Sequence, residues 1–289
     1  MIIDAHVHLC PKGILEKTYT KGIMPAHGLV SNNPYDDYVL LAKERGISKA
    51  IVFPMPLLEM KRKDKDPYVI EAYRKYPDFF VPLVLIDTGL QEIQKYTDEI
   101  AGVKEHILIT NGSDMEERFP IYEWMVEKNL FLTIHPEKYK ESETVKKISS
   151  NFPKLKIILA HSGRNKTMTG NGMYENALEL KTYSNIFFDT SNIREPDKLF
   201  QFINIVGSQR VFFGSDYPFG AKDIYTEEFK TVINMPVSSE IKENILFNNV
   251  FQTIVAPFEK KQKIASHSKF TLPMQEVMIK NRVESIQRG

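Results

Sequence analysis

Short apolar runs alternate with polar segments along the first 250 or so residues. The runs are rich in β-branched and aromatic residues, which is typical of buried strands, whereas the polar segments carry apolar residues at three- and four-residue spacing, which is typical of helices. The pattern predicts eight strands, at 2–9, 50–53, 80–86, 102–106, 130–135, 156–161, 185–189 and 210–216. It predicts helices at 35–45, 67–76, 116–128, 142–151, 174–181 and 196–205, with Pro67 and Pro196 each in a first turn.

This alternation favours a closed barrel. Strands that are apolar on both faces and separated by helices are typical of parallel sheets, and eight of them predict an α/β fold of the (β/α)8 TIM-barrel type. No Gly-x-Gly-x-x-Gly follows a predicted strand, which disfavours an open dinucleotide-binding sheet. Beyond residue 257 the chain becomes basic and polar. We therefore predict a barrel domain over 1–257 and a basic C-terminal extension over 258–289.

The composition limits the classes of partner that the protein is expected to bind. The 289 residues include 38 basic and 37 acidic side chains, a formal charge of +1, so no overall field attracts nucleic acid or an anionic membrane. The single cysteine, Cys10, cannot form an intramolecular disulfide, and no apolar leader precedes the first strand. We expect a cytoplasmic protein with a small-molecule substrate, with no nucleic-acid or membrane partner, and with a second copy of the chain as a candidate partner.

The first strand carries two histidines, His6 and His8, one residue apart. Alternate residues of a strand share a face about 6.6 Å apart, so both imidazoles can reach one ion. His135, His161 and Asp216 end the predicted fifth, sixth and eighth strands. Because active residues of such barrels lie at the carboxyl ends of strands, all five side chains are predicted at one rim, which indicates a metal centre.

The residue types indicate which metal and which chemistry. Neutral imidazoles of His6, His8 and His135 with the Asp216 carboxylate suit one divalent ion, Zn²⁺ first, with Mn²⁺ or Fe²⁺ as alternatives. A cation also removes the cost of placing the Asp216 charge after an apolar strand. His161 is predicted to orient or deprotonate an activated water, or to polarise the substrate.

Five motifs then resemble a known family: Asp4-Ala5-His6-Val7-His8, Ile134-His135-Pro136, Ala160-His161-Ser162-Gly163, Phe213-Gly214-Ser215-Asp216-Tyr217-Pro218-Phe219 and Ile245-Leu246-Phe247-Asn248-Asn249. Their order and spacing resemble the amidohydrolase superfamily. The most similar branch is amidohydrolase family 2, which includes aminocarboxymuconate semialdehyde decarboxylase, aromatic acid decarboxylases and pyrone dicarboxylate lactonase. The resemblance implies that His6, His8, His135 and Asp216 are metal ligands, that His161 is catalytic, and that Asp216 also shuttles a proton.

Three further residues are candidates for substrate binding. Arg164 replaces a glycine that the branch often has, and its guanidinium could hold a carboxylate by two hydrogen bonds or be a solvated loop charge. Lys104 lies where binuclear relatives carry a carboxylated lysine; we favour a single metal, with Lys104 contacting a substrate anion or pairing with Glu105. His106, two residues on, could face the same lumen.

The main functional prediction is a metal-dependent hydrolase that acts on an amide, ester or lactone through metal-activated water. The alternative is a metal-dependent decarboxylase of an unsaturated or aromatic carboxylic acid. Two other classes stay open: a metal-dependent deoxyribonuclease, which the near-neutral charge disfavours, and a barrel that binds without catalysing. Metal content and product analysis distinguish these interpretations.

Overall fold

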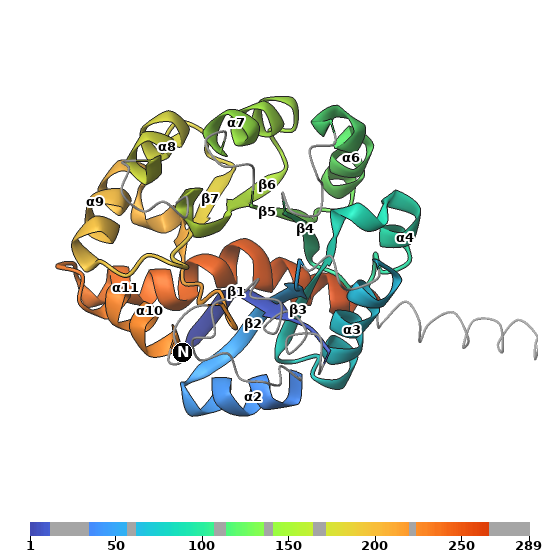
Figure 1. Ribbon diagram of the computed structural model, residues 1–289, viewed down its shortest axis with the longest axis horizontal. Coiled ribbons are helices and arrows are strands. Elements are labelled where there is room, and N and C mark those ends of the chain that lie inside the picture. Colours follow the sequence, from blue (N-terminus) through green and yellow to red (C-terminus); the bar gives the residue numbers. More distant parts are fainter. Residues whose placement is uncertain are drawn as a thin grey trace, which may run out of the picture.

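The computed structural model describes residues 1–11, 35–56, 62–106, 114–135, 141–163, 172–219 and 224–265. Eight parallel strands form one sheet in chain order, with helices arranged around them (Figure 1). The strands are β1 (Ile2–Leu9), β2 (Ile47–Pro54), β3 (Phe80–Leu85), β4 (Gly102–His106), β5 (Phe131–His135), β6 (Lys156–Leu159), β7 (Ile186–Asp189) and β8 (Val211–Phe212). The helices are α2 (Tyr35–Glu44), α3 (Arg62–Lys75), α4 (Leu90–Gln94), α6 (Phe119–Glu127), α7 (Glu141–Asn151), α8 (Gly172–Leu180), α9 (Pro196–Val206), α10 (Ile224–Ile233) and α11 (Ser239–Glu243).

Backbone hydrogen bonds close the sheet into a barrel. Residues that follow β8 bond to β1: Ala5 N donates to Phe213 O at 2.8 Å, His8 N to Tyr217 O at 2.7 Å, and Asp216 N to His6 O at 2.9 Å. The predicted α/β barrel is therefore confirmed. These bonds also place Asp216 beside the two histidines of β1, which links the fold directly to the candidate site.

Several predicted boundaries are wrong. β6 ends at Leu159, before His161, because His161 and Ser162 adopt left-handed backbone angles (φ 55° and 50°) in the turn η3 (Ala160–Gly163). Pro67 lies inside α3 rather than in its first turn, whereas Pro196 does begin α9. The helices α4, α10 and α11 have no counterpart among the predicted segments.

A helical stretch over 239–265, which includes the π-helical segments η5 (Asn244–Asn248) and η6 (Phe251–Val255), packs at the amino ends of the strands. Val250, Ile254 and Phe258 are buried in a cluster with Ile3 and Phe80. Residues 258–265 of the predicted extension continue this helix, and residues 266–289 lie outside the described part of the chain. Among the described helices, none is long and apolar enough to cross a membrane.

Candidate metal centre

Three side chains meet at the rim where β1 and the segment after β8 lie together. Nε2 of His6 and Nε2 of His8 are 3.3 Å apart, and Oδ1 of Asp216 lies 3.2 Å from each of them. Tetrahedral zinc with bonds of about 2.05 Å has ligand atoms about 3.4 Å apart, so this triangle matches one face of such a site. His6, His8 and Asp216 therefore form a group that could hold a metal ion.

The charges at this triangle also suit a cation. Burial lowers the pKa of His8 to about 3, so its imidazole is neutral at pH 7. Burial alone would raise the pKa of Asp216, but the nearby His161 and hydrogen bonds with His6 and His8 hold it well below its usual range. When Nε2 of each histidine is unprotonated, as it must be in a metal ligand, lone pairs of all three atoms converge on one point, and a divalent ion would satisfy them.

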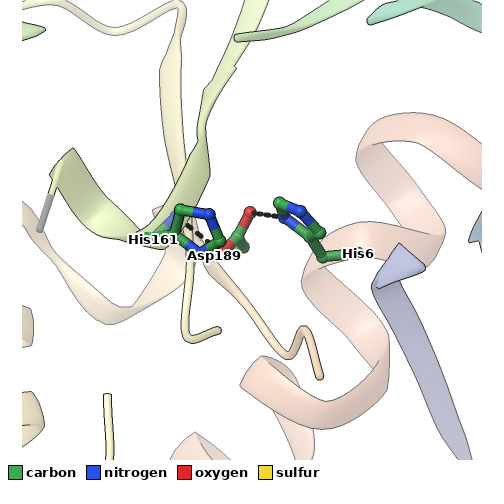
Figure 2. Close-up of side chains that lie close together, drawn as sticks. All are labelled: His6, His161 and Asp189. Atoms are coloured by element: carbon green, nitrogen blue, oxygen red, sulfur yellow. Dashed lines mark hydrogen bonds and ion pairs between the residues drawn. The ribbon is translucent and has the colours of Figure 1, made fainter. Parts of the chain in front are cut away.

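Asp189, at the end of β7, is a site residue that the sequence reasoning missed. Its Oδ2 lies 2.8 Å from Nδ1 of His6, and its Oδ1 accepts the backbone N–H of His161 at 2.9 Å. Figure 2 shows this carboxylate between the two histidines. Although burial raises the pKa of Asp189, the charge and hydrogen bond of His6 lower it to about 2. Asp189 ends a predicted strand at the same rim as the other candidates, so the same rule could have found it.

His161 lies against the same cluster. Its ring centroid is 4.8 Å from that of His6, and its Nδ1 is 2.7 Å from Oγ of Ser191. Burial lowers the pKa of His161 to about 4, so the neutral ring can accept a proton. A group formed by His6, His161 and Asp189 also has ligand atoms close enough for an ion. However, Asp189 already bonds Nδ1 of His6, which leaves Nε2 of His6 for the triangle with His8 and Asp216.

His135 lies farther from the triangle than predicted for a ligand in direct contact. Its ring is 4.8 Å from the ring of His161 and 4.3 Å from that of His106, its register partner on β4. Neither group of potential ligands found among the described residues includes it. Burial lowers the pKa of His135 well below the usual range, so the ring is neutral, as a ligand must be. Its role in metal binding stays a prediction.

Lys104 is a fully enclosed ammonium on β4. The side chain is 1% exposed, and Nζ lies 4.4 Å from the centroid of the Phe53 ring. Among the described residues, no group forms a hydrogen bond with Nζ. Burial lowers the pKa of Lys104 to about 8, against the opposing influence of Asp189 and Asp216.

The predicted alternative in which Lys104 pairs with Glu105 is wrong. Glu105 points to the other side of β4, where it accepts a hydrogen bond from Tyr122 at 2.5 Å and pairs with Arg118 at 3.0 Å. Successive side chains of a strand face opposite sides, so Lys104 and Glu105 cannot share an environment. Burial and the charge of Lys104 lower the pKa of His106 well below its usual range. Arg164 lies outside the described residues.

The loop after β7 supports Asp216 from the other side. Nδ2 of Asn192 donates to Oδ2 of Asp216 at 2.7 Å, and the backbone N–H of Asn192 donates to Oε1 of Glu228 on α10 at 3.1 Å. Asn192 has a left-handed backbone (φ 61°), a conformation that asparagine tolerates better than most residues. Glu228 is completely buried, and burial raises its pKa to about 9, although Nε of Arg194 lies 4.0 Å from its Oε1 and opposes this shift. Sequence reasoning gave no signal for either residue.

One protein-family model matches most of the chain. The family Amidohydro_2, described as amidohydrolase, matches residues 3–249. A structure of 4-oxalomesaconate hydratase from Rhodopseudomonas palustris is 17% identical, with 94% of this chain and 100% of that chain covered and a TM-score of 0.63.

Two further structures were solved with a metal ion. Dihydroxybenzoic acid decarboxylase from Polaromonas sp. JS666, with bound manganese and the inhibitor 2-nitroresorcinol, is 16% identical, covers 87% of this chain and 96% of its own, and has a TM-score of 0.64. An amidohydrolase from Burkholderia multivorans with bound zinc is 12% identical, covers 88% and 98%, and has a TM-score of 0.68. At these identities the structures establish a shared fold.

Proposed function

Because the chain belongs to the Amidohydro_2 family of amidohydrolases, we propose that it is a metal-dependent carboxy-lyase that removes carbon dioxide from an aromatic or unsaturated carboxylic acid. Similar structures with this fold include a dihydroxybenzoic acid decarboxylase and a hydratase of an unsaturated acid. Both names describe carboxylic acid chemistry, which supports the decarboxylase alternative over the hydrolase that was the main prediction from sequence.

The observation that carries the proposal is Lys104. With a pKa of about 8, Lys104 is protonated in most molecules at pH 7, yet no described group forms a hydrogen bond with Nζ. A buried charge is costly unless it is paired. A substrate carboxylate would supply the counter-charge that the Phe53 ring, 4.4 Å from Nζ, does not provide.

The rim residues would divide the remaining work. His6, His8 and Asp216 would hold the ion, with His135 as a candidate fourth ligand. The ion, when bound, would act as a Lewis acid on substrate oxygens. In decarboxylation the carbon–carbon bond to the carboxylate breaks, its electron pair stays on the substrate carbon, and that carbon takes up a proton. His161 accepts a proton from a substrate hydroxyl or from water and returns it to this carbon.

Hydrolysis remains the second candidate, because a neutral His161 beside a metal cluster also suits deprotonation of water. One contact weighs against it. In a hydrolase of this kind Asp216 would also carry a proton, but its Oδ2 already accepts a hydrogen bond from Asn192 at 2.7 Å. Proton transfer through that oxygen would compete with this bond.

Product analysis tests the proposal. Full-length protein is loaded with Zn²⁺ or Mn²⁺ and given a panel of carboxyl-¹³C hydroxybenzoates and unsaturated diacids, alongside lactones and anilides in ¹⁸O water. We expect release of ¹³CO₂ from at least one acid and no ¹⁸O in the product, with His161→Ala reducing turnover while keeping the ion. Hydrolysis of a lactone or anilide without decarboxylation of any acid would contradict the proposal.

A further inference from the structure

We propose that the single carboxylate of Asp189 fixes the tautomers of both His6 and His161, directly for the first ring and through the hydroxyl of Ser191 for the second. Both imidazoles then carry their proton on Nδ1 and present an unprotonated Nε2 to the metal centre. The tautomers follow from hydrogen-bond geometry alone, whereas their catalytic meaning rests on the function proposed above. Asp189 and Ser191 are positioning residues in this scheme.

The arm to His6 is a direct bond. Oδ2 of Asp189 lies 2.8 Å from Nδ1 of His6, and both side chains are fully buried (Figure 2). An ionised carboxylate can only accept, so Nδ1 of His6 must donate. Although burial lowers the pKa of His6, the charge of Asp189 raises it above its ordinary value, so the ring can hold a second proton on Nε2 when no metal is bound. In the neutral ring, which is the form that binds a metal ion, the proton stays on Nδ1 and the other nitrogen is unprotonated. Nε2 of His6, which lies in the triangle with His8 and Asp216, is therefore the nitrogen able to bind a metal.

The arm to His161 passes through one hydroxyl group. Oγ of Ser191 bonds Oδ1 of Asp189 on one side and lies 2.7 Å from Nδ1 of His161 on the other. A hydroxyl group has a single hydrogen, and the carboxylate can only accept it. Ser191 must therefore accept a hydrogen bond from Nδ1 of His161. The proton of the neutral ring is on Nδ1, and Nε2 carries a lone pair.

The surroundings keep Asp189 ionised and fixed, as the scheme requires. Besides the two arms, Oδ1 accepts the backbone N–H groups of His161 at 2.9 Å and Ser191 at 3.1 Å. Asp189 and Ser191 are both 0% exposed, so water does not compete for these bonds.

The contact between His161 and Asn192 is consistent with the same tautomer. Nδ2 of Asn192 is 3.4 Å from Nδ1 of His161, whereas it is only 2.7 Å from Oδ2 of Asp216. An amide nitrogen only donates. One of its two hydrogens bonds to the carboxylate, and the 3.4 Å contact with Nδ1 of His161 is much longer than the 2.7 Å bond between Nδ1 and Oγ of Ser191.

In this scheme the carboxylate of Asp189 supports two functions, metal binding by His6 and proton transfer by His161, which can be tested separately. Loss of the direct arm removes the constraint on a metal-binding ring, and loss of such an outer partner typically lowers metal affinity 10- to 100-fold. Loss of the hydroxyl arm removes the constraint on the proton-transferring ring and leaves the metal-binding ring in place. Ser191→Ala should therefore affect turnover and Asp189→Asn should affect metal affinity as well.

Nuclear magnetic resonance reads the tautomers without an activity assay. Full-length protein with ¹⁵N-labelled histidine is recorded metal-free and zinc-loaded, with His6 and His161 assigned from single substitutions. In the zinc-loaded wild type we expect the Nδ1–H tautomer for both rings, and in the metal-free protein we expect it for His161, whereas His6 can also carry a second proton. In Ser191→Ala we expect His161 to lose this tautomer while His6 keeps it, and Ser191→Thr, which retains a hydroxyl, should restore it.

Ser162→Ala is the matched control. The hydroxyl group of Ser162 donates to the backbone oxygen of Asp189. The variant therefore removes a buried hydroxyl group that bonds to Asp189, as Ser191→Ala does, but one that contacts neither histidine ring. Zinc affinity from a chelator competition should stay within about twofold of wild type in Ser162→Ala and Ser191→Ala, and fall 10- to 100-fold in Asp189→Asn.

Two results would overturn the inference: an Nε2–H tautomer for His161 in the wild type, or an unchanged His161 tautomer in Ser191→Ala. Either can occur in an active decarboxylase, and the expected tautomers can occur in a protein that decarboxylates none of the acids. Failure of this inference is thus distinguishable from failure of the proposed function. If Asp189→Asn does not fold, the Ser191 pair still decides the question.

Discussion

The two sides of the barrel mouth differ in how far their buried polar side chains are hydrogen-bonded. On the β7–β8 side, which includes Asp189, Ser191, Asn192 and Asp216, side chains bond to one another over short distances, as in the 2.7 Å contact between Asn192 and Asp216. Behind them, Oε2 of Glu228 is the exception, with no hydrogen-bond partner among the described residues. On the β4–β5 side, Lys104 Nζ and Thr133 Oγ1 have no hydrogen-bond partner among the described residues. The two residues are register partners on adjacent strands, so their unmet bonds lie next to each other.

This contrast indicates a division of labour. A buried polar group with satisfied bonds is held in one orientation, which suits ligands and proton-transfer groups that must be positioned before the substrate arrives. A buried polar group without bonds is costly, and a bound molecule that supplies them recovers that cost. We infer that the β7–β8 side positions the catalytic groups and that the β4–β5 side recognises the substrate.

The largest expected effect compares His8 on β1, which lies 3.2 Å from Asp216 of the β7–β8 side, with His135 on the β4–β5 side. His8→Ala removes a corner of the triangle of ligand atoms, and we expect zinc affinity to fall by more than about 100-fold, because a direct ligand should count for more than an outer partner. His135→Ala should cost less, because its ring packs on His106 and His161 rather than on that triangle. Zinc content after dialysis and a chelator competition measure both. An equal or greater loss in His135→Ala would place a principal ligand on the β4–β5 side and break the comparison.

An intermediate effect is expected at Lys104. Lys104→Met keeps the length of the side chain and removes its charge, so KM for a carboxylate substrate should rise about 10- to 100-fold, in line with the loss of a charge-assisted hydrogen bond. Lys156→Met is the matched control, because Lys156 lies at the amino end of β6, where Nζ donates to the carbonyl oxygen of Thr253 at 3.0 Å. This variant should leave KM unchanged.

The same variant tests the second-metal alternative. If Lys104 were carboxylated and bridged two ions, Lys104→Met would lower the metal content from two ions per chain to one or none. With a single ion, metal content is the same in wild type and Lys104→Met. Elemental analysis of both proteins separates the two cases, and a loss of metal in the variant would move Lys104 from substrate recognition to metal binding.

The sequence predicted the site residues that lie on strands or at their ends. It did not predict the features that depend on turns or on packing between distant segments. His6, His8 and Asp216 were found because β1 is long and the motif around Asp216 is distinctive. The position of His161 was predicted, but its left-handed backbone was not, because nothing in the strand pattern of 156–161 marks the end of β6 at Leu159. Asn192 and Glu228 come together only through packing of α10 on the loop after β7, which no local pattern reveals.

The last expected effect concerns stability and not binding or turnover, and it sharpens the account of the β7–β8 side. Burial raises the pKa of Glu228 from 4.5 to about 9, so the folded protein keeps this proton over a pH range in which the unfolded chain releases it. Because the folded state then binds more protons, the free energy of unfolding falls as pH rises from about 5 to 9, by at most about 1.4 kcal/mol per pH unit. Glu228→Gln removes this titration and keeps an oxygen that can accept from Asn192. Its stability relative to wild type should therefore increase with pH.

Urea unfolding at several pH values between 5 and 9 measures this difference. Glu227→Gln is the control for loss of a carboxyl group at the neighbouring position, where the side chain is 46% exposed and lies 3.6 Å from Nε of Arg194. A wild-type advantage over Glu228→Gln that grows with pH would mean that Glu228 is ionised and paired in the folded protein. The support behind Asn192 and Asp216 would then be an ion pair, and the β7–β8 side would depend on charge where we infer a neutral buried acid.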